Sequence, residues 1–238
     1  MEKIRKQLKR SIKPYDTVIA RYVLRPLSAV IVQYLSKTFV TPNEITVSKF
    51  LLEICVAFFW IWGNFYQILC TLPLVFLALL FDCVDGDLAR VKNMETPMGA
   101  WLDLILDRTG DGILFLSAAL ISCVKNVAYT SWILAYVAVF GILMDALTTE
   151  KQHTLVKDFK PAITCITNSF FREVILLFSG DFFLIALTIG VIINKIDLAL
   201  GFIALLSNGY WTTRVIVYWK NSGILDFDHK QNAEHEGG

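Results

Sequence analysis

The chain has 238 residues, of which 55% are hydrophobic and only 18% are charged, which is too apolar for an ordinary soluble domain. Its formal net charge is only +1, so the composition gives no reason to expect nucleic acid or a strongly acidic partner. The sequence therefore predicts a protein that folds in a lipid bilayer.

The first predicted element is an amphipathic helix over residues 15–37. This stretch mixes apolar positions with Arg21, Arg25 and Lys37 and contains Pro26. Such a pattern is typical of a helix that lies in the membrane interface, and the alternative is a soluble amphipathic cap. We assign residues 1–40 to a cytoplasmic N-terminus that carries this helix.

Six apolar segments follow, and each approaches the roughly 20 residues that a spanning helix needs. They lie near 45–63, 67–90, 98–124, 129–149, 172–194 and 196–219. We therefore expect an all-α, polytopic membrane domain of six transmembrane helices over residues 41–220. The polar residues 221–238 are expected to form a disordered cytoplasmic tail.

Basic residues are distributed unevenly between the predicted loops. If the N-terminus is cytoplasmic, the opposite side of the membrane receives only Lys125 and Lys195. The positive-inside rule then predicts a multi-pass protein of the cell membrane with both termini and the active site in the cytoplasm.

Cysteine and histidine show no metal-binding pattern. The five cysteines have no CxxC spacing, and the three histidines are scattered over a loop and the tail. Neither pattern favours zinc or a disulfide framework.

Carboxylates recur at helical spacing between residues 81 and 111, although charged residues in apolar helices are costly and default to functional hypotheses. Positions i, i+3, i+4 and i+7 of one predicted helix share a face, and they hold Asp82, Asp85, Gly86 and Ala89. On the next helix every fourth residue forms a second face, which holds Gly99, Asp103 and Asp107.

A short polar turn joins these two helices, so we expect them to be antiparallel neighbours. Their cytoplasmic ends would bring four carboxylates together: Asp82, Asp85, Asp103 and Asp107. Such a group repels itself unless cations fill the space, and hard oxygen ligands favour Mg²⁺ or Mn²⁺ over zinc or copper. A two-metal site of this kind clamps phosphates and leaves one carboxylate free to take a proton.

Small residues on the same faces fit a nucleotide or phosphate site. Gly86, Ala89 and Gly99 carry little bulk, so a ligand can approach the backbone closely. Arg90 lies one residue beyond this face and can reach a phosphate. The alternative for the small residues is ordinary close packing of membrane helices.

Together these residues resemble the signature of the CDP-alcohol phosphotransferase family, DxxDGxxARx8GxxxDxxxD. All eight fixed residues are present between 82 and 107 with every spacing intact. The upstream TPNEIT segment, with Thr41, Pro42, Asn43 and Thr46, is similar to the family's pattern at the start of its first span. The six-span layout is similar too.

The resemblance implies roles for individual residues. The first three aspartates would ligate two Mg²⁺ or Mn²⁺ ions per active site, and Asp107 would both contact metal and act as general base on the acceptor hydroxyl. The CDP moiety would be seated by residues near the helix ends, namely Gly86, Ala89, Arg90 and Gly99, to which we add Asn43 and Thr46. Members of the family usually form homodimers, so a second copy of the chain is an expected partner beside membrane lipids.

The run from Asp85 to Asp111 is most similar to an archaeal and bacterial branch of the family that transfers groups to inositol phosphate or a related phosphorylated polyol. Its products include soluble inositol phosphodiesters and phosphoinositol lipids. Aminoalcohol or glycerophosphate transfer is an alternative with the same chemistry. Alternatives from other classes are a divalent-cation transporter, since intramembrane carboxylates also mark ion pathways, and a structural membrane scaffold.

Two arginines near the cytoplasmic ends of the last two spans suit a phosphate on the acceptor. We assign acceptor binding to Arg172 and Arg214, with Lys157 or Lys160 of the preceding loop as a further cation. The alternative is that the two arginines extend toward lipid headgroups.

Overall fold

The computed structural model describes residues 16–126, 129–155 and 180–236, and every regular element in them is a helix. A π-helical turn, η1 (Ala20–Leu24), leads into a series of α-helices: α2 (Arg25–Leu35), α3 (Pro42–Trp62), α4 (Phe65–Leu69), α5 (Thr71–Lys92), α6 (Pro97–Asn126), α7 (Thr130–Leu155), α9 (Gly180–Ile192) and α10 (Ile196–Glu236). The prediction of an all-α protein is confirmed for this part of the chain.

Three helical segments are long and apolar enough to cross a membrane: Pro42–Trp62, Phe65–Lys92 and Thr130–Thr149. The other predicted spans also correspond to helices, although α9 has only 13 described residues and α6 carries several charged residues among its 30. Residues 172–179 of the predicted fifth span lie outside the described residues. Three spans are therefore clear, and the total of six stays a prediction.

The outward face of α3 shows why this helix suits lipid. Large apolar side chains recur every three or four residues along it and are all exposed: Val47, Leu51, Ile54, Phe58 and Trp62. The opposite face carries Ile45, Val56 and Trp60, which are buried against the other helices. A helix with a continuous apolar outer face and buried apolar side chains on its inner side suits a place in a membrane bundle where the outer face meets lipid.

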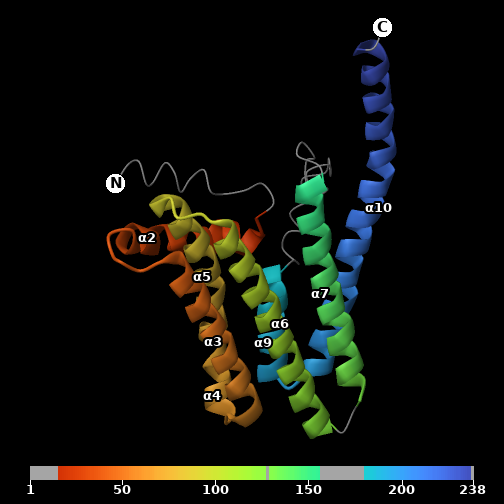
Figure 1. The fold of residues 1–238 in the computed structure, drawn as a ribbon. Coiled ribbons are helices and arrows are strands. Elements are labelled where there is room, and N and C mark those ends of the chain that lie inside the picture. The colour runs from red at the N-terminus through yellow and green to blue at the C-terminus, as the bar shows by residue number, and fades with distance from the viewer. Residues whose placement is uncertain (1–15, 127–128, 156–179, 237–238) are drawn as a thin grey trace.

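Helix α3 is the centre of the bundle near the acidic residues. It packs extensively against both α5 and α6, whereas α5 and α6 hardly contact each other. The sequence predicts that α5 and α6 pack directly against each other, and that detail is wrong. The two helices are antiparallel and joined by a short turn (Figure 1), but each packs mainly against α3. The turn fixes only where the two helices meet, and their axes diverge from there.

Local capping interactions and hydrogen bonds fix the start of α3 and the end of α5. The N-cap Thr41 forms a capping box with Glu44, so both side chains bond to backbone N–H groups at the start of α3. Helix α5 ends at Lys92, and the C-cap residue Asn93 adopts the left-handed conformation that asparagine tolerates (φ 55°). Beside it, the Lys92 ammonium donates to the carbonyl oxygens of Thr38 and Val40, both at 2.7 Å.

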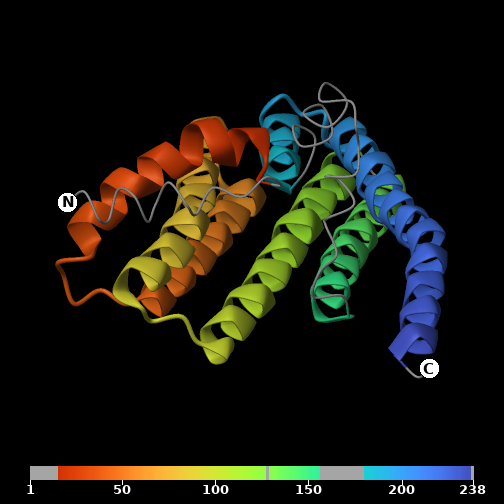
Figure 2. The same cartoon turned by 90° about the horizontal axis from the view of Figure 1, so that it is seen from above.

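Helix α2 lies across the ends of the bundle and not along it, as Figures 1 and 2 show. A buried ion pair holds it there: the Arg25 guanidinium donates to Asp87 of α5 at 2.8 Å, and the Ser28 hydroxyl donates to the other oxygen of that carboxylate at 2.8 Å. Burial by itself would lower the pKa of Arg25, but the carboxylates of Asp87 and Asp16 outweigh this effect and raise it.

The end of the chain differs from expectation in its backbone. The sequence predicts a disordered tail over residues 221–238, whereas α10 continues as a helix to Glu236. A reason is that no proline occurs between residues 196 and 236, so nothing in the backbone chemistry forces the helix to stop.

The Arg25–Asp87 contact generates a stability prediction. Arg25→Met would remove one of the two guanidinium partners of the Asp87 carboxylate, whose side chain is only 1% exposed, and would leave it with Arg90 and Ser28. We expect the free energy of unfolding to fall by roughly 2 kcal/mol, because the buried carboxylate loses one charge-assisted hydrogen bond. Denaturant unfolding of the purified protein in detergent micelles measures this loss. Lys37→Met, at an exposed position just after α2, is the matched control, and equal stabilities of the two variants would contradict the role of the ion pair.

Candidate active site

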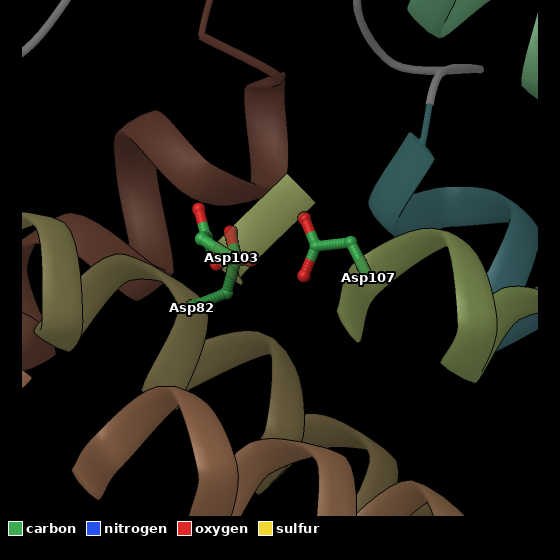
Figure 3. Close-up of side chains that lie close together, drawn as sticks. All are labelled: Asp82, Asp103 and Asp107. Carbon is green, nitrogen blue, oxygen red and sulfur yellow. The ribbon is translucent and has the colours of Figure 1, made fainter. Parts of the chain in front are cut away.

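Three of the four predicted carboxylates converge in space. Asp82 lies on α5, and Asp103 and Asp107 lie one turn apart on α6. One carboxylate oxygen of each lies within 4.8 Å of the others, and Figure 3 shows the three groups directed toward a common region. Helical spacing of four residues aligns the two α6 side chains, and Asp82 meets them from the neighbouring helix.

Asp85 stands slightly apart from this group. Its side chain is buried, and its Oδ2 atom accepts a hydrogen bond from the Thr46 hydroxyl at 2.8 Å. The spacing that placed Asp85 on the face of Asp82 is correct for the helix, but its carboxylate is engaged by α3. Thr46, which the sequence analysis assigned to binding of the CDP moiety, therefore contacts one of the motif aspartates.

Lys49 is a residue of the site that the sequence reasoning missed. Its ammonium donates to Asp82 Oδ1 at 2.5 Å and also to Asp107, and the residue is only 6% exposed. A single positive charge thus lies between two of the clustered carboxylates and offsets part of their mutual repulsion. The signal was a lysine inside an otherwise apolar span, which is costly unless it faces a partner.

The polar face of α3 extends one turn further. Thr46, Lys49 and Glu53 occupy positions i, i+3 and i+7 of this helix, and all three are buried. Glu53 was also missed by the sequence reasoning. Together the three residues form a polar stripe on the side of α3 that faces α5 and α6.

Arg108 supplies the second positive charge near the carboxylates. Its guanidinium donates to Asp111 at 2.8 Å and lies 3.8 Å from Asp107.

The Asp103 Oδ1 atom, by contrast, is buried and accepts no hydrogen bond from any described residue. A buried carboxylate oxygen that accepts no hydrogen bond costs free energy of desolvation unless a cation or another ligand binds to it. The clustered carboxylate oxygens are the ligand atoms that a divalent metal such as Mg²⁺ or Mn²⁺ prefers.

The small residues and Arg90 of the motif lie at the ends of α5 and α6. A methyl group on Gly99 would come within 3.2 Å of the Asn43 side-chain oxygen, so this glycine lets the first turns of α3 and α6 approach closely. Gly86 and Ala89 are partly accessible on α5. The Arg90 guanidinium forms an ion pair with Asp87 at 2.8 Å and is thereby connected to the carboxylate that holds α2.

Two adjoining cavities lie beside the aspartates. The smaller, of about 130 Å³, is lined by the ionisable residues Lys49, Glu53, Asp82, Asp107, Arg108, Asp111 and Asp181. The larger, of about 310 Å³, lies between α6, α7, α9 and α10. Arg108, Ile142, Gly180 and Phe183 line both cavities, so the two spaces meet at these residues.

Arg214 is the one predicted acceptor-binding residue among the described residues. Its guanidinium pairs with the Asp145 carboxylate at 3.0 Å and donates to Thr149, and both of these residues line the larger cavity. The arginine therefore faces the bundle and not the lipid. The other predicted acceptor-binding residues, Arg172, Lys157 and Lys160, lie outside the described residues.

Comparison with known proteins identifies the family of the fold. A model of the family described as CDP-alcohol phosphatidyltransferase matches residues 39–206, which is more than half of the chain. The resemblance that the sequence motif indicated is thereby confirmed. The match includes the acidic cluster and the polar face of α3, and ends within α10.

Three individual relatives show how far the similarity extends along the chain. A Bifunctional IPC transferase and DIPP synthase of Aquifex aeolicus is 37% identical over 153 residues, which cover 63% of this chain and 34% of that protein. A protein of the same name from Thermococcus kodakarensis is 31% identical and covers 57% of this chain and 30% of that protein. A Phosphatidylinositol phosphate synthase of Corynebacterium glutamicum is 28% identical over 58% of this chain and 67% of that protein. The chain therefore spans only about a third of the two bifunctional relatives.

The converging carboxylates generate a prediction about metal affinity. We expect Asp103→Asn and Asp82→Asn to weaken Mn²⁺ binding at least about tenfold, because each replaces an anionic ligand by a neutral amide. Isothermal titration calorimetry on the metal-free protein measures the affinity. Glu95→Gln, an exposed position in the turn before α6, is the matched control for the loss of a negative charge. Unchanged Mn²⁺ affinity in both aspartate variants would contradict the assignment of the ligands.

Proposed function

The chain belongs to the CDP-alcohol phosphatidyltransferase family, and we propose that it transfers a substituted phosphate group from a CDP-alcohol to a hydroxyl of a phosphorylated polyol such as inositol phosphate, with release of CMP. The observation that carries this proposal is the convergence of Asp82, Asp103 and Asp107 beside a cavity. The names of the relatives support an inositol-phosphate acceptor. The product would be a phospholipid or a soluble inositol phosphodiester.

The proposal assigns two Mg²⁺ or Mn²⁺ ions to the four motif aspartates, Asp82, Asp85, Asp103 and Asp107. Divalent metal at this position supplies positive charge that stabilises the bridging phosphates and the departing CMP. The unpartnered Asp103 oxygen and the all-oxygen donor set support this assignment. Lys49 contributes further positive charge from α3, between Asp82 and Asp107.

Asp107 is the proposed general base. Its carboxylate lies at the edge of the smaller cavity, where an acceptor hydroxyl can approach it, and would take the proton as that oxygen attacks the β-phosphorus of the donor. Lys49 donates a hydrogen bond to Asp107, and Arg108 lies nearby. These contacts fix the orientation of the carboxylate, which supports a positioned base.

The CDP moiety is assigned to the end of the bundle where the small residues of the motif lie. Gly86 and Ala89 would admit the nucleotide to the surface of α5, and Gly99 with Asn43 would form the opposite wall. Arg90 would hold a phosphate, and its pairing with Asp87 keeps it at this end of α5. Thr46 completes the set through its hydrogen bond to Asp85.

The acceptor phosphate is assigned to the larger cavity. Arg214 borders this space through Asp145 and Thr149, and Arg172, Lys157 and Lys160 are proposed as further cations. An acceptor that spans both cavities would place its phosphate near Arg214 and a hydroxyl near Asp107. We further propose that the protein is a homodimer in the cell membrane with its active site on the cytoplasmic side.

A substrate panel tests the proposed function. The purified protein is incubated with Mg²⁺, a CDP-alcohol donor and one acceptor at a time, and products are identified by mass spectrometry. The donors are CDP-diacylglycerol and CDP-inositol, and the acceptors are inositol 1-phosphate, glycerol 3-phosphate and ethanolamine. We expect CMP release and product with inositol 1-phosphate, and none in excess EDTA because the clustered carboxylates need metal. Preference for ethanolamine, or full turnover in EDTA, would refute the proposal.

The assignment of the base generates a kinetic prediction. Asp107→Asn should lower kcat by roughly 10²- to 10⁴-fold, the usual contribution of a positioned general base, while binding of CDP is retained. Steady-state kinetics together with calorimetric CDP binding separate the two effects. Asp111→Asn, one turn further along α6, is the control for loss of a neighbouring carboxylate and should reduce kcat less. A wild-type kcat in Asp107→Asn would remove the residue from the proton transfer.

A further inference from the structure

Glu53 is a buried acid that the proposed mechanism does not use. The residue is only 3% exposed, it lies on the polar face of α3 one turn beyond Lys49, and it lines the smaller cavity. Its Oε2 atom is buried and has no hydrogen-bond partner among the described residues. A carboxyl oxygen in this condition carries the full cost of desolvation, so a ligand that bonded to it would recover part of that cost.

The fold makes room for this carboxyl group. A Cβ atom on Gly110 of α6 would overlap Glu53 Oε2, so only a glycine at this position allows the side chain to lie where it does. Gly110 follows Asp107 by three residues, close to one helical turn. Glu53 therefore contacts α6 about 4.5 Å along the helix axis from the proposed base.

The other acids of the smaller cavity already have donors. Lys49 donates to Asp82 and Asp107, Arg108 donates to Asp111, and the Thr17 hydroxyl donates to Asp181. Among the acids that line this space, and within the described part of the chain, Glu53 is thus the one with a buried oxygen that accepts no hydrogen bond. This distinguishes Glu53 from a carboxylate that merely belongs to the acidic cluster.

We infer that the smaller cavity binds a second hydroxyl of the acceptor, distinct from the hydroxyl that reacts, and that Glu53 is the hydrogen-bond partner of this second hydroxyl. The inference rests on the proposed function and names the substrate class of the same site: a polyhydroxylated acceptor. A hydroxyl suits the position because it both donates and accepts, so it satisfies the carboxyl group in either protonation state. A further cation is less suited, because Lys49 and Arg108 already line the cavity.

This arrangement makes Glu53 a determinant of specificity. An acceptor with hydroxyls on several carbons can place one at Asp107 and another at Glu53, one helical turn away. An alcohol with a single hydroxyl leaves the buried carboxyl group unsatisfied when it binds. Sites built to hydrogen-bond a substrate hydroxyl discriminate strongly against analogues that lack it, for this same reason.

The test compares two acceptors with wild-type protein, Glu53→Leu and Glu53→Gln. Inositol 1-phosphate has hydroxyls to spare beyond the reacting one, and 2-hydroxyethyl phosphate has none. For inositol 1-phosphate we expect Glu53→Leu to raise the acceptor KM about ten- to a hundred-fold, with a smaller change for Glu53→Gln, whose amide still offers a hydrogen bond. For 2-hydroxyethyl phosphate, and for the KM of the donor, we expect no increase.

Two further measurements separate this role from others. The thermal unfolding midpoint of Glu53→Leu without acceptor should equal or exceed that of the wild type, because the change removes a buried oxygen without a partner. Calorimetric Mn²⁺ affinity and stoichiometry should stay unchanged. Glu95→Gln controls for loss of a negative charge.

Each contrary outcome identifies what has failed. Equal KM changes for both acceptors, or no change for either, would overturn the role of Glu53 while leaving the proposed reaction intact. Loss of a bound Mn²⁺ ion would show that Glu53 is a metal ligand instead, and a lowered unfolding midpoint would show a structural role. Wild-type protein that converts neither acceptor refutes the proposed function, and the inference with it, before any variant is examined.

Discussion

The structure depends on how positive charge is supplied to carboxylates inside a low-dielectric bundle. Asp82, Asp103 and Asp107 converge within 4.8 Å, and such a group is unstable without cations between or around it. Lys49 and Arg108 provide part of that charge from α3 and α6. Neither cation donates a hydrogen bond to the buried Oδ1 atom of Asp103, and a divalent metal is a suitable partner for this oxygen.

Helix α3 has a double role that follows from its two faces. Its outer face is apolar and suits lipid, whereas its inner face carries Thr46, Lys49 and Glu53 toward the site. Because α3 packs against both α5 and α6, these three residues lie between the two helices of the motif. The motif thus supplies the acids, and α3 supplies groups that orient them and line the cavity.

The sequence predicts the acidic cluster well because helical periodicity is a local property. A spacing of four residues aligns Asp103 with Asp107 on any helix, and the short turn returns α6 toward Asp82. Lys49 and Glu53 were missed because two charges in a long apolar span do not show which neighbour they face. The separation of α5 from α6 was missed for a similar reason: a turn restrains helix ends, and the course of the axes depends on what packs between them.

The residues proposed to bind the acceptor were less accessible to sequence reasoning. Arg214 was named from its place near a helix end, but its pairing with Asp145 and its position beside the larger cavity are tertiary facts. Hydropathy likewise predicted six spans, of which three are clear in the structure, since charges in α6 and the length of α9 obscure the others. A sequence pattern that repeats every 3.6 residues shows which residues share one face of a helix, and the packing of the helices determines what that face contacts.

The shared carboxylate of Asp87 has a consequence for how this protein can evolve. One oxygen atom of Asp87 accepts from Arg25 of α2 and from Arg90 of the motif, and both contacts measure 2.8 Å. Replacing Arg25 removes one of the two guanidinium partners of this buried carboxylate, and replacing Asp87 removes the acceptor that both arginines share, so each change is harmful until the other has occurred. Among descendants of this sequence the two positions should therefore vary together, although 62 residues separate them along the chain.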